Sequence, residues 1–196
     1  MPLGAFKAAL MGTAGATAAG DVVLLSTQTA SNSASLSFTS GIDSTYGEYI
    51  FRFYNINPAT DGSHFSFQAN AAGASGYNET MTTTQFYPTH AEDDSAAALT
   101  YHEGFDQAQG TAFQGLAISV GNDADQDCTG ELHLFNPSST TYVKHFTSTV
   151  AMSINTNKAV TDFNAGYFNI TEAIDDVQFK MSSGNFDGKI KMWGVK

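Results

Sequence analysis

The densest group of side chains that could bind a metal ion is a short acidic turn, in which Asp123, Asp125 and Asp127 stand at alternate positions. Carboxylates spaced in this way can converge on a hard cation such as Ca²⁺, which takes about six to eight oxygen ligands. The EF-hand pattern fails, because Cys128 stands where glycine is required and Leu134 where the bidentate glutamate belongs. Two interpretations remain: a structural calcium site, or a solvated turn whose charge aids solubility. We expect no other cofactor.

Two carboxylate pairs, Glu103 with Asp106 and Glu172 with Asp175, have the residue types of a glycosidase acid and base. Such a pair should project from a sheet into a groove, whereas these pairs fall in an expected loop and an expected helical turn. The five histidines show no metal-ligand spacing, and no nucleophile elbow, phosphate loop or dinucleotide fingerprint occurs. We therefore predict that the protein is not an enzyme.

Trp193 and Tyr101 are the candidate contacts for a ligand or partner, because exposed aromatic rings stack on sugars and anchor interfaces. Trp193 is the one tryptophan, and it falls on the same side of its expected strand as Lys189 and Lys191. The alternative, which we favour, is that Trp193 packs at the sheet edge or against a neighbouring subunit, as tryptophans in β-domains usually do.

Composition excludes several classes of function. The chain has 8 Lys and Arg against 19 Asp and Glu, a formal net charge of -11, whereas nucleic acid requires a basic surface. One cysteine, Cys128, excludes an internal disulfide framework. No apolar run is long enough for a signal peptide or a membrane span. We expect neither nucleic acid nor a membrane as a partner.

The elements that would position these side chains are mostly strands. Charged residues are only 14% of the chain, which disfavours surface helices. Alternating aromatic residues mark strands around 49–54 and 64–68, which we expect to form a hairpin across the turn at 57–62. We expect a long loop over 88–115 and a helical turn over 171–175. Further strands are expected near residues 80–87, 116–120, 131–134, 142–152, 167–168, 177–181 and 190–192.

Many short strands with few helix signals predict an all-β fold, an antiparallel β-sandwich of jelly-roll type. Residues 21–196 form one domain in this prediction, and residues 1–20 form a short N-terminal arm. Leu3, Phe6 and Leu10 lie at helical spacing in the arm and are its candidate docking residues. The alternative is that the arm lies over the end of its own domain.

Several longer phrases carry a family resemblance: NINPATDGSHFSFQ at 55–68, GELHLFNPSS at 130–139, FKMSSGN at 179–185 and KIKMWG at 189–194. With the opening MPLGAFKAAL, they span nearly the whole chain. The sequence resembles small virion structural proteins of marine tailed phages, of the cyanophage and pelagiphage type. That family supplies no catalytic residues to carry over.

The resemblance implies a non-enzymatic virion structural protein, most simply a capsid-surface decoration or head-fibre type subunit. The alternative is a tail-fibre or receptor-binding adhesin subunit that recognises a glycan or protein on the host surface. The implied partners are other virion proteins, whether capsid or tail subunits, further copies of this chain, and a host receptor in the adhesin case. The implied location is the virion, assembled in the cytoplasm of the host bacterium.

Overall fold

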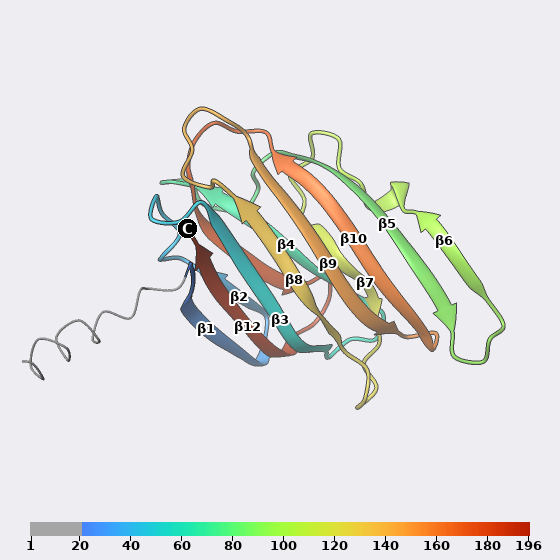
Figure 1. The fold of residues 1–196 in the computed structure, drawn as a ribbon. Coiled ribbons are helices and arrows are strands. Elements are labelled where there is room, and N and C mark those ends of the chain that lie inside the picture. The colour runs from blue at the N-terminus through green and yellow to red at the C-terminus, as the bar shows by residue number, and fades with distance from the viewer. Residues whose placement is uncertain (1–20) are drawn as a thin grey trace, which may run out of the picture.

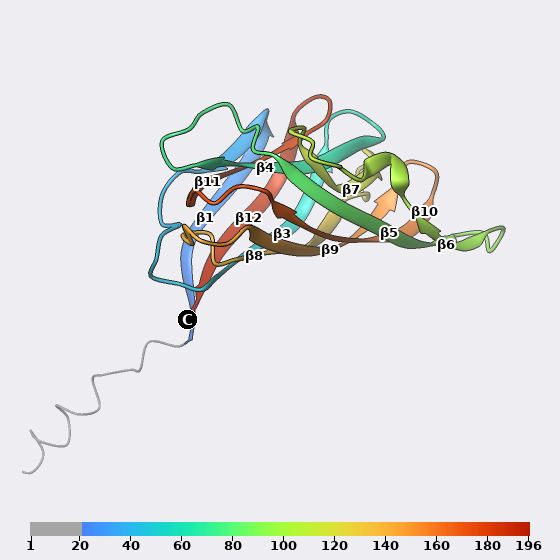
Figure 2. The same cartoon turned by 90° about the horizontal axis from the view of Figure 1, so that it is seen from above.

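The protein is an all-β, two-layered structure (Figures 1 and 2). The computed structural model describes residues 21–196, so the expected arm at 1–20, with Leu3, Phe6 and Leu10, lies outside the described residues. Within them, every strand pairs antiparallel with its neighbours. The elements are β1 (Val22–Ser33), β2 (Ser35–Phe38), β3 (Glu48–Pro58), β4 (Ser63–Ala71), β5 (Met81–Ala91), β6 (Ala97–Tyr101), the 3₁₀ turn η1 (Glu103–Phe105), β7 (Gln114–Val120), β8 (Cys128–Phe135), β9 (Lys144–Ile154), β10 (Lys158–Phe168), β11 (Ile174–Met181) and β12 (Phe186–Val195).

The strand order confirms the predicted jelly roll. The larger, front sheet runs β1-β12-β3-β8-β9-β10-β5-β6, and the smaller, back sheet runs β2-β11-β4-β7. A single residue pair, Val120 with Ile154, joins β7 to β9 and so connects the two layers at one side. The four-strand orders β1-β12-β3-β8 and β2-β11-β4-β7, with successive strands passing between layers, are the two sheets of a jelly roll.

Two hairpins are added to this framework and lengthen only the front sheet. The β5–β6 hairpin is inserted between β4 and β7, and the β9–β10 hairpin between β8 and β11. All four strands join the front sheet beyond β8, so this sheet extends past the back sheet (Figure 2). We call β5, β6, β9 and β10, together with the residues 102–110 that follow β6, the extension.

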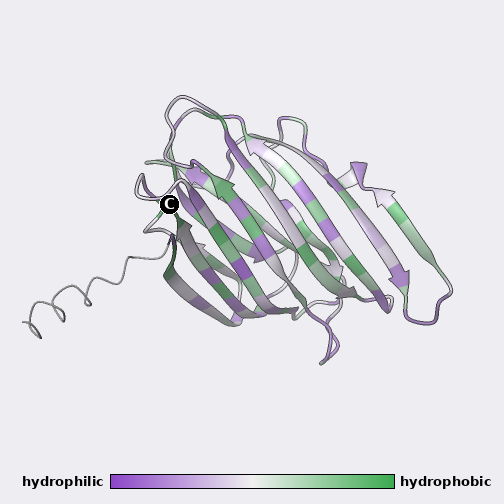
Figure 3. Cartoon of the chain, in the orientation of Figure 1, coloured by the Kyte–Doolittle hydropathy of each residue, from purple (hydrophilic) through white to green (hydrophobic). Residues whose placement is uncertain are grey.

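The core of the jelly roll is aromatic. Strands of both layers alternate apolar and polar residues (Figure 3), and the apolar side of each strand faces the other layer. Phe179 of β11 lies at the centre, with its ring centroid 5.3 Å from those of Phe51 and Phe53 and 5.8 Å from that of Phe65. Burial of these large rings makes the largest favourable contribution to the stability of the jelly-roll core.

The expected hairpin between 49–54 and 64–68 is wrong. β3 belongs to the front sheet and β4 to the back sheet, and the turn between them crosses from one layer to the other. The rings of Phe53 and Phe65 nevertheless meet face to edge at 5.1 Å. Alternation reports which side of a strand is buried, and both strands bury their aromatic side in the same core, so the pattern could not separate the two arrangements.

Two local predictions also fail. The segment 171–175 makes no helical turn, because its backbone groups form hydrogen bonds to distant segments instead. Ile174 N–H donates to Pro137 O at 2.8 Å, and Ala173 O accepts from Ala72 N–H at 2.8 Å. The long loop expected at 88–115 contains the end of β5, all of β6 and η1. The strands expected near residues 131–134 and 142–152 are confirmed as β8 and β9, which pair as an antiparallel hairpin.

Candidate functional site

Part of the extension has no strand facing its inner side. The back sheet ends at β7, which contacts the inner side of β10, and the inner side of β5 is covered by the chain that follows β6. That chain runs along the outer edge of β5: His102 N–H donates to Gln85 O at 2.9 Å, and Thr83 N–H donates to Gln107 O at 2.9 Å. Between these contacts the η1 turn arches away from β5 and forms the roof of a pocket.

A buried glutamine of β7 holds this roof in place. The Gln114 side-chain amide donates to Phe105 O at 3.1 Å, and its carbonyl accepts from the Thr83 hydroxyl at 2.8 Å. Thr83 Oγ1 in turn accepts from Gln107 N–H at 2.8 Å. The Gln114 side chain therefore links the back sheet, η1 and β5, and these hydrogen bonds hold the roof in one position.

The pocket under η1 has a volume of about 280 Å³. Three rings line it, those of Tyr87, His102 and Phe105, together with the apolar side chains of Ile118, Ile154 and Val160. The three rings and Ser119 are only half-buried, so the pocket opens to solvent. Its one acidic group is Asp162 of β10.

Asp162 is fully buried, at 0% exposure. One carboxylate oxygen, Oδ2, accepts from Ile118 N–H at 3.0 Å, and the other, Oδ1, has no hydrogen-bond partner. Burial raises the pKa of this carboxyl to about 7, a rise that the nearby Gln85 amide and Ile118 N–H only moderate. The Gln85 amide does not reach hydrogen-bond geometry with any group. Asp162 thus changes charge near neutral pH.

Unpartnered buried polar atoms concentrate around this pocket. All such side-chain atoms in residues 21–196, apart from Trp193 Nε1, belong to the extension. Native interiors pair nearly all their buried polar groups, so a concentration of exceptions indicates a place where water or a ligand supplies the missing partners. The residues are Gln85, Thr89, His102, Asp106, Gln107, Ser148, Asp162 and Asn164.

The imidazoles near the pocket are neutral at pH 7. Burial lowers the pKa of His102, whose ring lies 4.4 Å from that of Phe105. Burial, and then the neighbouring His102, lower the pKa of His64, whose Nδ1 accepts from Ser119 N–H at 2.9 Å. Asp162 is therefore the only pocket residue that carries charge at this pH.

The outer side of the extension carries a second feature, an aromatic face beside a free strand edge. The rings of Phe86 and Phe163 stack at 5.0 Å, and Tyr101 of β6 stands opposite Phe86 in the register. Tyr101 is 60% exposed and Leu99 74%. The Tyr101 hydroxyl donates to Asp106, and within residues 21–196 the β6 strand pairs only with β5. We call Phe86, Leu99, Tyr101 and Phe163 the outer aromatic face.

The three aspartates of the acidic turn do not converge on one point in the structure. In the part of the chain that the structure describes, no three His, Cys, Asp or Glu side chains are placed to hold a metal ion, and this includes Asp123, Asp125 and Asp127. Asp127 Oδ2 accepts from Asn55 Nδ2 at 2.7 Å. The calcium interpretation and the solvated-turn interpretation both stay predictions.

Trp193 lies on the outer side of β12, where its register partners are Leu24 of β1 and Ile50 of β3. It is half-buried, and its indole N–H has no partner. The structure therefore places the two predicted contact residues, Trp193 and Tyr101, in different regions of the front sheet, and only Tyr101 lies in the extension.

The sequence prediction missed Asp162. Alternation in this strand points the wrong way, because it puts Phe163 and Tyr167 on one side and Asp162 and Asn164 on the other, and so predicts that Asp162 is exposed. Its partners in the pocket were missed for a different reason: His102 and Phe105 come from the segment predicted as a loop.

No protein-family model matches the chain, and no curated protein does either. Among solved structures, a legume lectin-like domain from Entamoeba histolytica is similar over 85% of this chain and 82% of that domain, with 7% identity and a TM-score of 0.24. A likeness this weak supports no conclusion about fold or function. No helix in residues 21–196 is long and apolar enough to cross a membrane.

Proposed function

We propose that this chain is a non-enzymatic structural subunit of a phage virion, most simply a capsid-surface decoration or head-fibre type subunit, which assembles through β6 and the outer aromatic face. The observation that carries the proposal is the free, uncharged edge of β6. Two further points support it: the jelly-roll topology, which viral capsid domains use widely, and the sequence resemblance to virion proteins.

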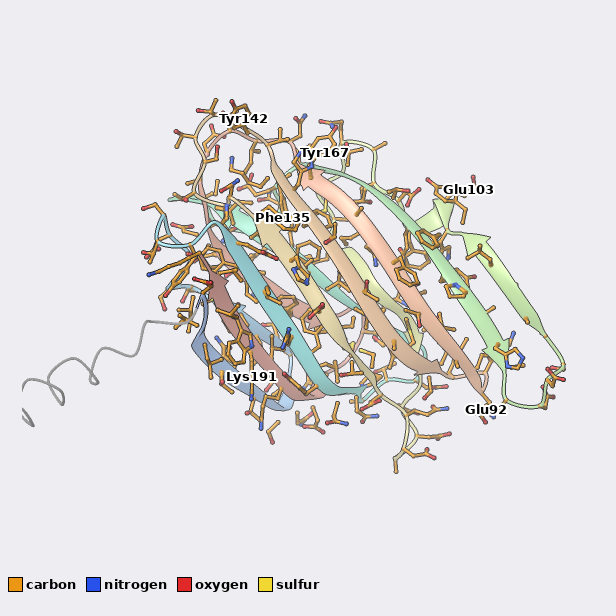
Figure 4. All side chains as sticks on the ribbon, viewed as in Figure 1. Glu92, Glu103, Phe135, Tyr142, Tyr167 and Lys191 are labelled. Atoms are coloured by element: carbon orange, nitrogen blue, oxygen red, sulfur yellow. The ribbon has the colours of Figure 1, made fainter. Side chains whose placement is uncertain are left out.

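Strand β6 lacks the features that normally protect an edge. Its sequence, Ala97 to Tyr101, contains no charged residue and no proline, and four of its five residues are exposed. Charged residues stand instead at the two ends of β6, with Asp94 before it and Glu103 and Asp106 after it, and Glu92 and Glu103 are labelled in Figure 4. An exposed edge of this kind presents unpaired N–H and C=O groups to a strand from another chain.

The outer aromatic face would add side-chain contacts to that strand pairing. Of the large hydrophobic residues that are exposed in residues 21–196, Phe86, Leu99 and Tyr101 gather on this one face. Contiguous apolar exposure of this kind marks interaction sites on proteins. A partner strand added to β6 would therefore gain both backbone hydrogen bonds and an apolar surface.

The domain can make a second connection at its opposite edge. Asp21, through which residues 1–20 join the domain, lies beside the C-terminus, since Lys196 N–H donates to Asp21 O at 2.9 Å. Strand β1 follows Asp21 and forms the edge of the front sheet opposite β6 (Figure 1). The arrangement is suitable for a subunit that contacts one neighbour at each edge.

The copy number of the protein in purified virions tests this proposal. Quantitative mass spectrometry should give about one copy per capsid subunit or per capsomer. A few to a few tens of copies per particle would contradict shell decoration and move the protein to the tail or a unique vertex. Absence from virions would overturn the proposal altogether.

A matched pair of variants tests the surface itself. Leu99→Lys places a charge beside the β6 edge, and we expect it to abolish incorporation of the protein into particles. Tyr142→Lys adds the same charge to an equally exposed side chain, also 74% exposed, in the turn after β8, and should incorporate normally. Equal incorporation of both variants would exclude β6 as the assembly edge.

The second candidate function, a tail-fibre or receptor-binding adhesin, is favoured by the stacked rings of Phe86 and Phe163. Exposed aromatic rings with an adjacent carboxyl group, here Asp106 beside the Tyr101 hydroxyl, can hold a sugar. Binding of the wild-type protein but not Phe86→Ala to host-surface glycans, together with low copy number, would favour this function over shell decoration.

A further inference from the structure

The pocket under η1 is independent of the proposed assembly surface, because it opens on the inner side of the front sheet. Its buried carboxyl, Asp162, has one oxygen without a partner. Among residues 21–196, no lysine, arginine or histidine forms an ion pair with it. A buried carboxylate without a counter-charge is costly, so a cation that entered the pocket would be strongly favoured.

The walls of the pocket determine which kind of cation fits. A divalent metal requires several oxygen or nitrogen ligands, and no such group of side chains occurs in the described chain. The rings of Tyr87 and Phe105 instead provide π faces, and Ile118, Ile154 and Val160 provide hydrocarbon contacts. Aromatic rings beside one carboxylate are the surroundings that favour an organic ammonium group.

The neighbouring titratable groups leave Asp162 as the dominant charge. His102 faces the pocket from the roof and His64 lies behind it, and burial lowers the pKa of both. Cys128 of β8 is fully buried, and burial raises the pKa of its thiol, so it stays neutral. The remaining titratable lining residue is Tyr87 of β5, and β7 contributes none.

We propose that the pocket under η1 binds a small organic ammonium ion, with the charged head beside Asp162 in the pocket wall and the hydrocarbon groups against Tyr87, Phe105 and Ile118. The pocket volume of about 280 Å³ is at the lower end of the range for ligand sites, which suits a compact molecule. The net charge of -11 draws cations toward the protein at low ionic strength.

Choline and its neutral isostere 3,3-dimethylbutan-1-ol provide the direct test, because they share a shape and differ in charge. Titration of the ¹⁵N-labelled protein at pH 8 should shift the amide resonances of Ile118, Ser119 and Val160, with choline binding at least tenfold more tightly than the alcohol. Between pH 6 and pH 8 the affinity for choline should rise about tenfold, as Asp162 ionises.

Two isosteric variants, each of which removes one negative charge, distinguish binding by the pocket carboxylate from attraction of cations by the overall negative charge of the protein. Asp162→Asn should reduce choline affinity to that of the alcohol, whereas Asp125→Asn, in the exposed acidic turn, should leave it unchanged. If Asp162→Asn fails to fold, the pH dependence of the wild-type protein still decides the matter.

Three results would overturn the proposal. Equal affinity for choline and the alcohol would show an apolar pocket without charge recognition. Resonance shifts confined to exposed acidic residues would show non-specific attraction of cations. No shift with either probe at tens of millimolar would show that the pocket holds water only.

Discussion

The jelly roll and the extension share one continuous front sheet but differ in what lies against its inner side. In the jelly roll, strands of the back sheet face the front sheet, and aromatic residues such as Phe51, Phe65 and Phe179 fill the space. In the extension, the facing elements are the edge strand β7 and the η1 segment, and the inward residues include Gln85 and Asp162. The same alternating pattern thus produces an apolar core in one region and a polar pocket in the other.

The difference follows from how each region satisfies its polar groups. Regular strands satisfy their own backbone groups and can bring large rings into contact, whereas an irregular segment needs side-chain hydrogen bonds to hold it, here those of Gln114. The extension keeps buried polar atoms unpartnered, which costs stability but leaves groups free to bind a ligand.

The largest effect should follow from removing the central ring of the jelly roll. Phe179→Ala deletes a fully buried side chain packed against several other rings, and we expect it to lower the free energy of unfolding by about 3–5 kcal/mol. Phe163→Ala, in the half-buried pair of the extension, should cost about 1 kcal/mol. Urea unfolding measures the free energy of unfolding of both variants. Equal losses would contradict the proposed difference in packing between the jelly roll and the extension.

The second prediction concerns the pH dependence of the extension. The pKa of Asp162 is raised from its ordinary value of 3.8 to about 7, so the folded state favours the protonated carboxyl. Its contribution to stability is complete below about pH 4 and is lost as the pH rises through 7. Relative to Asp162→Asn, the wild-type protein should therefore lose about 2–3 kcal/mol between pH 5 and pH 8.

Urea unfolding of both proteins at the two pH values measures this loss, and Asp125→Asn controls for removal of an exposed negative charge. Parallel pH profiles for the wild-type protein and Asp162→Asn would mean that Asp162 is solvated in the folded state. The pocket would then not be the low-dielectric site described above.

The third prediction concerns a titratable group on the outer side of the jelly roll. Burial lowers the pKa of His133, but the carboxylates of Glu48 and Glu131, at 2.5 and 3.1 Å from its two ring nitrogens, outweigh burial and leave the pKa raised. The stability gained from this pairing is present below about pH 6.5 and is lost as the pH rises through the raised pKa.

His133→Gln should therefore cost about 0.5–1 kcal/mol at pH 6 and less at pH 8.5, as measured by thermal unfolding. His145→Gln, which removes an exposed histidine of β9, is the control for loss of an imidazole and should cost little. A cost for His133→Gln that is independent of pH would show that His133 contributes packing rather than charge.

The smallest effect is expected at the β6 edge. Because the Leu99 side chain is 74% exposed, Leu99→Lys should change the free energy of unfolding by less than about 0.5 kcal/mol, in contrast to its proposed effect on assembly. Chemical unfolding of the isolated protein checks this. A loss of 2 kcal/mol or more would mean that β6 supports the fold of the extension, and its assembly defect would then have a different cause.

Strands that bury one side and expose the other were predicted from the sequence, and edge strands were missed. The strands around 49–54 and 177–181 were predicted because each buries one side and exposes the other. β1 and β6 were missed because both form edges of the front sheet: β6 is exposed on both sides, and β1 begins with Val22-Val23-Leu24-Leu25, which does not alternate. Without one buried side, an edge strand carries no periodic signal.

The amino-acid sequence by itself determined the all-β class and the acidic surface, because alternation, turn residues and charge are properties of short segments. Only the tertiary structure decided that the turn after Pro58 crosses between layers, that Asp123, Asp125 and Asp127 do not converge, and that Asp162 faces a pocket roofed by η1. These features depend on which distant segment lies opposite each strand, and that is fixed by packing of the whole chain rather than by any local pattern.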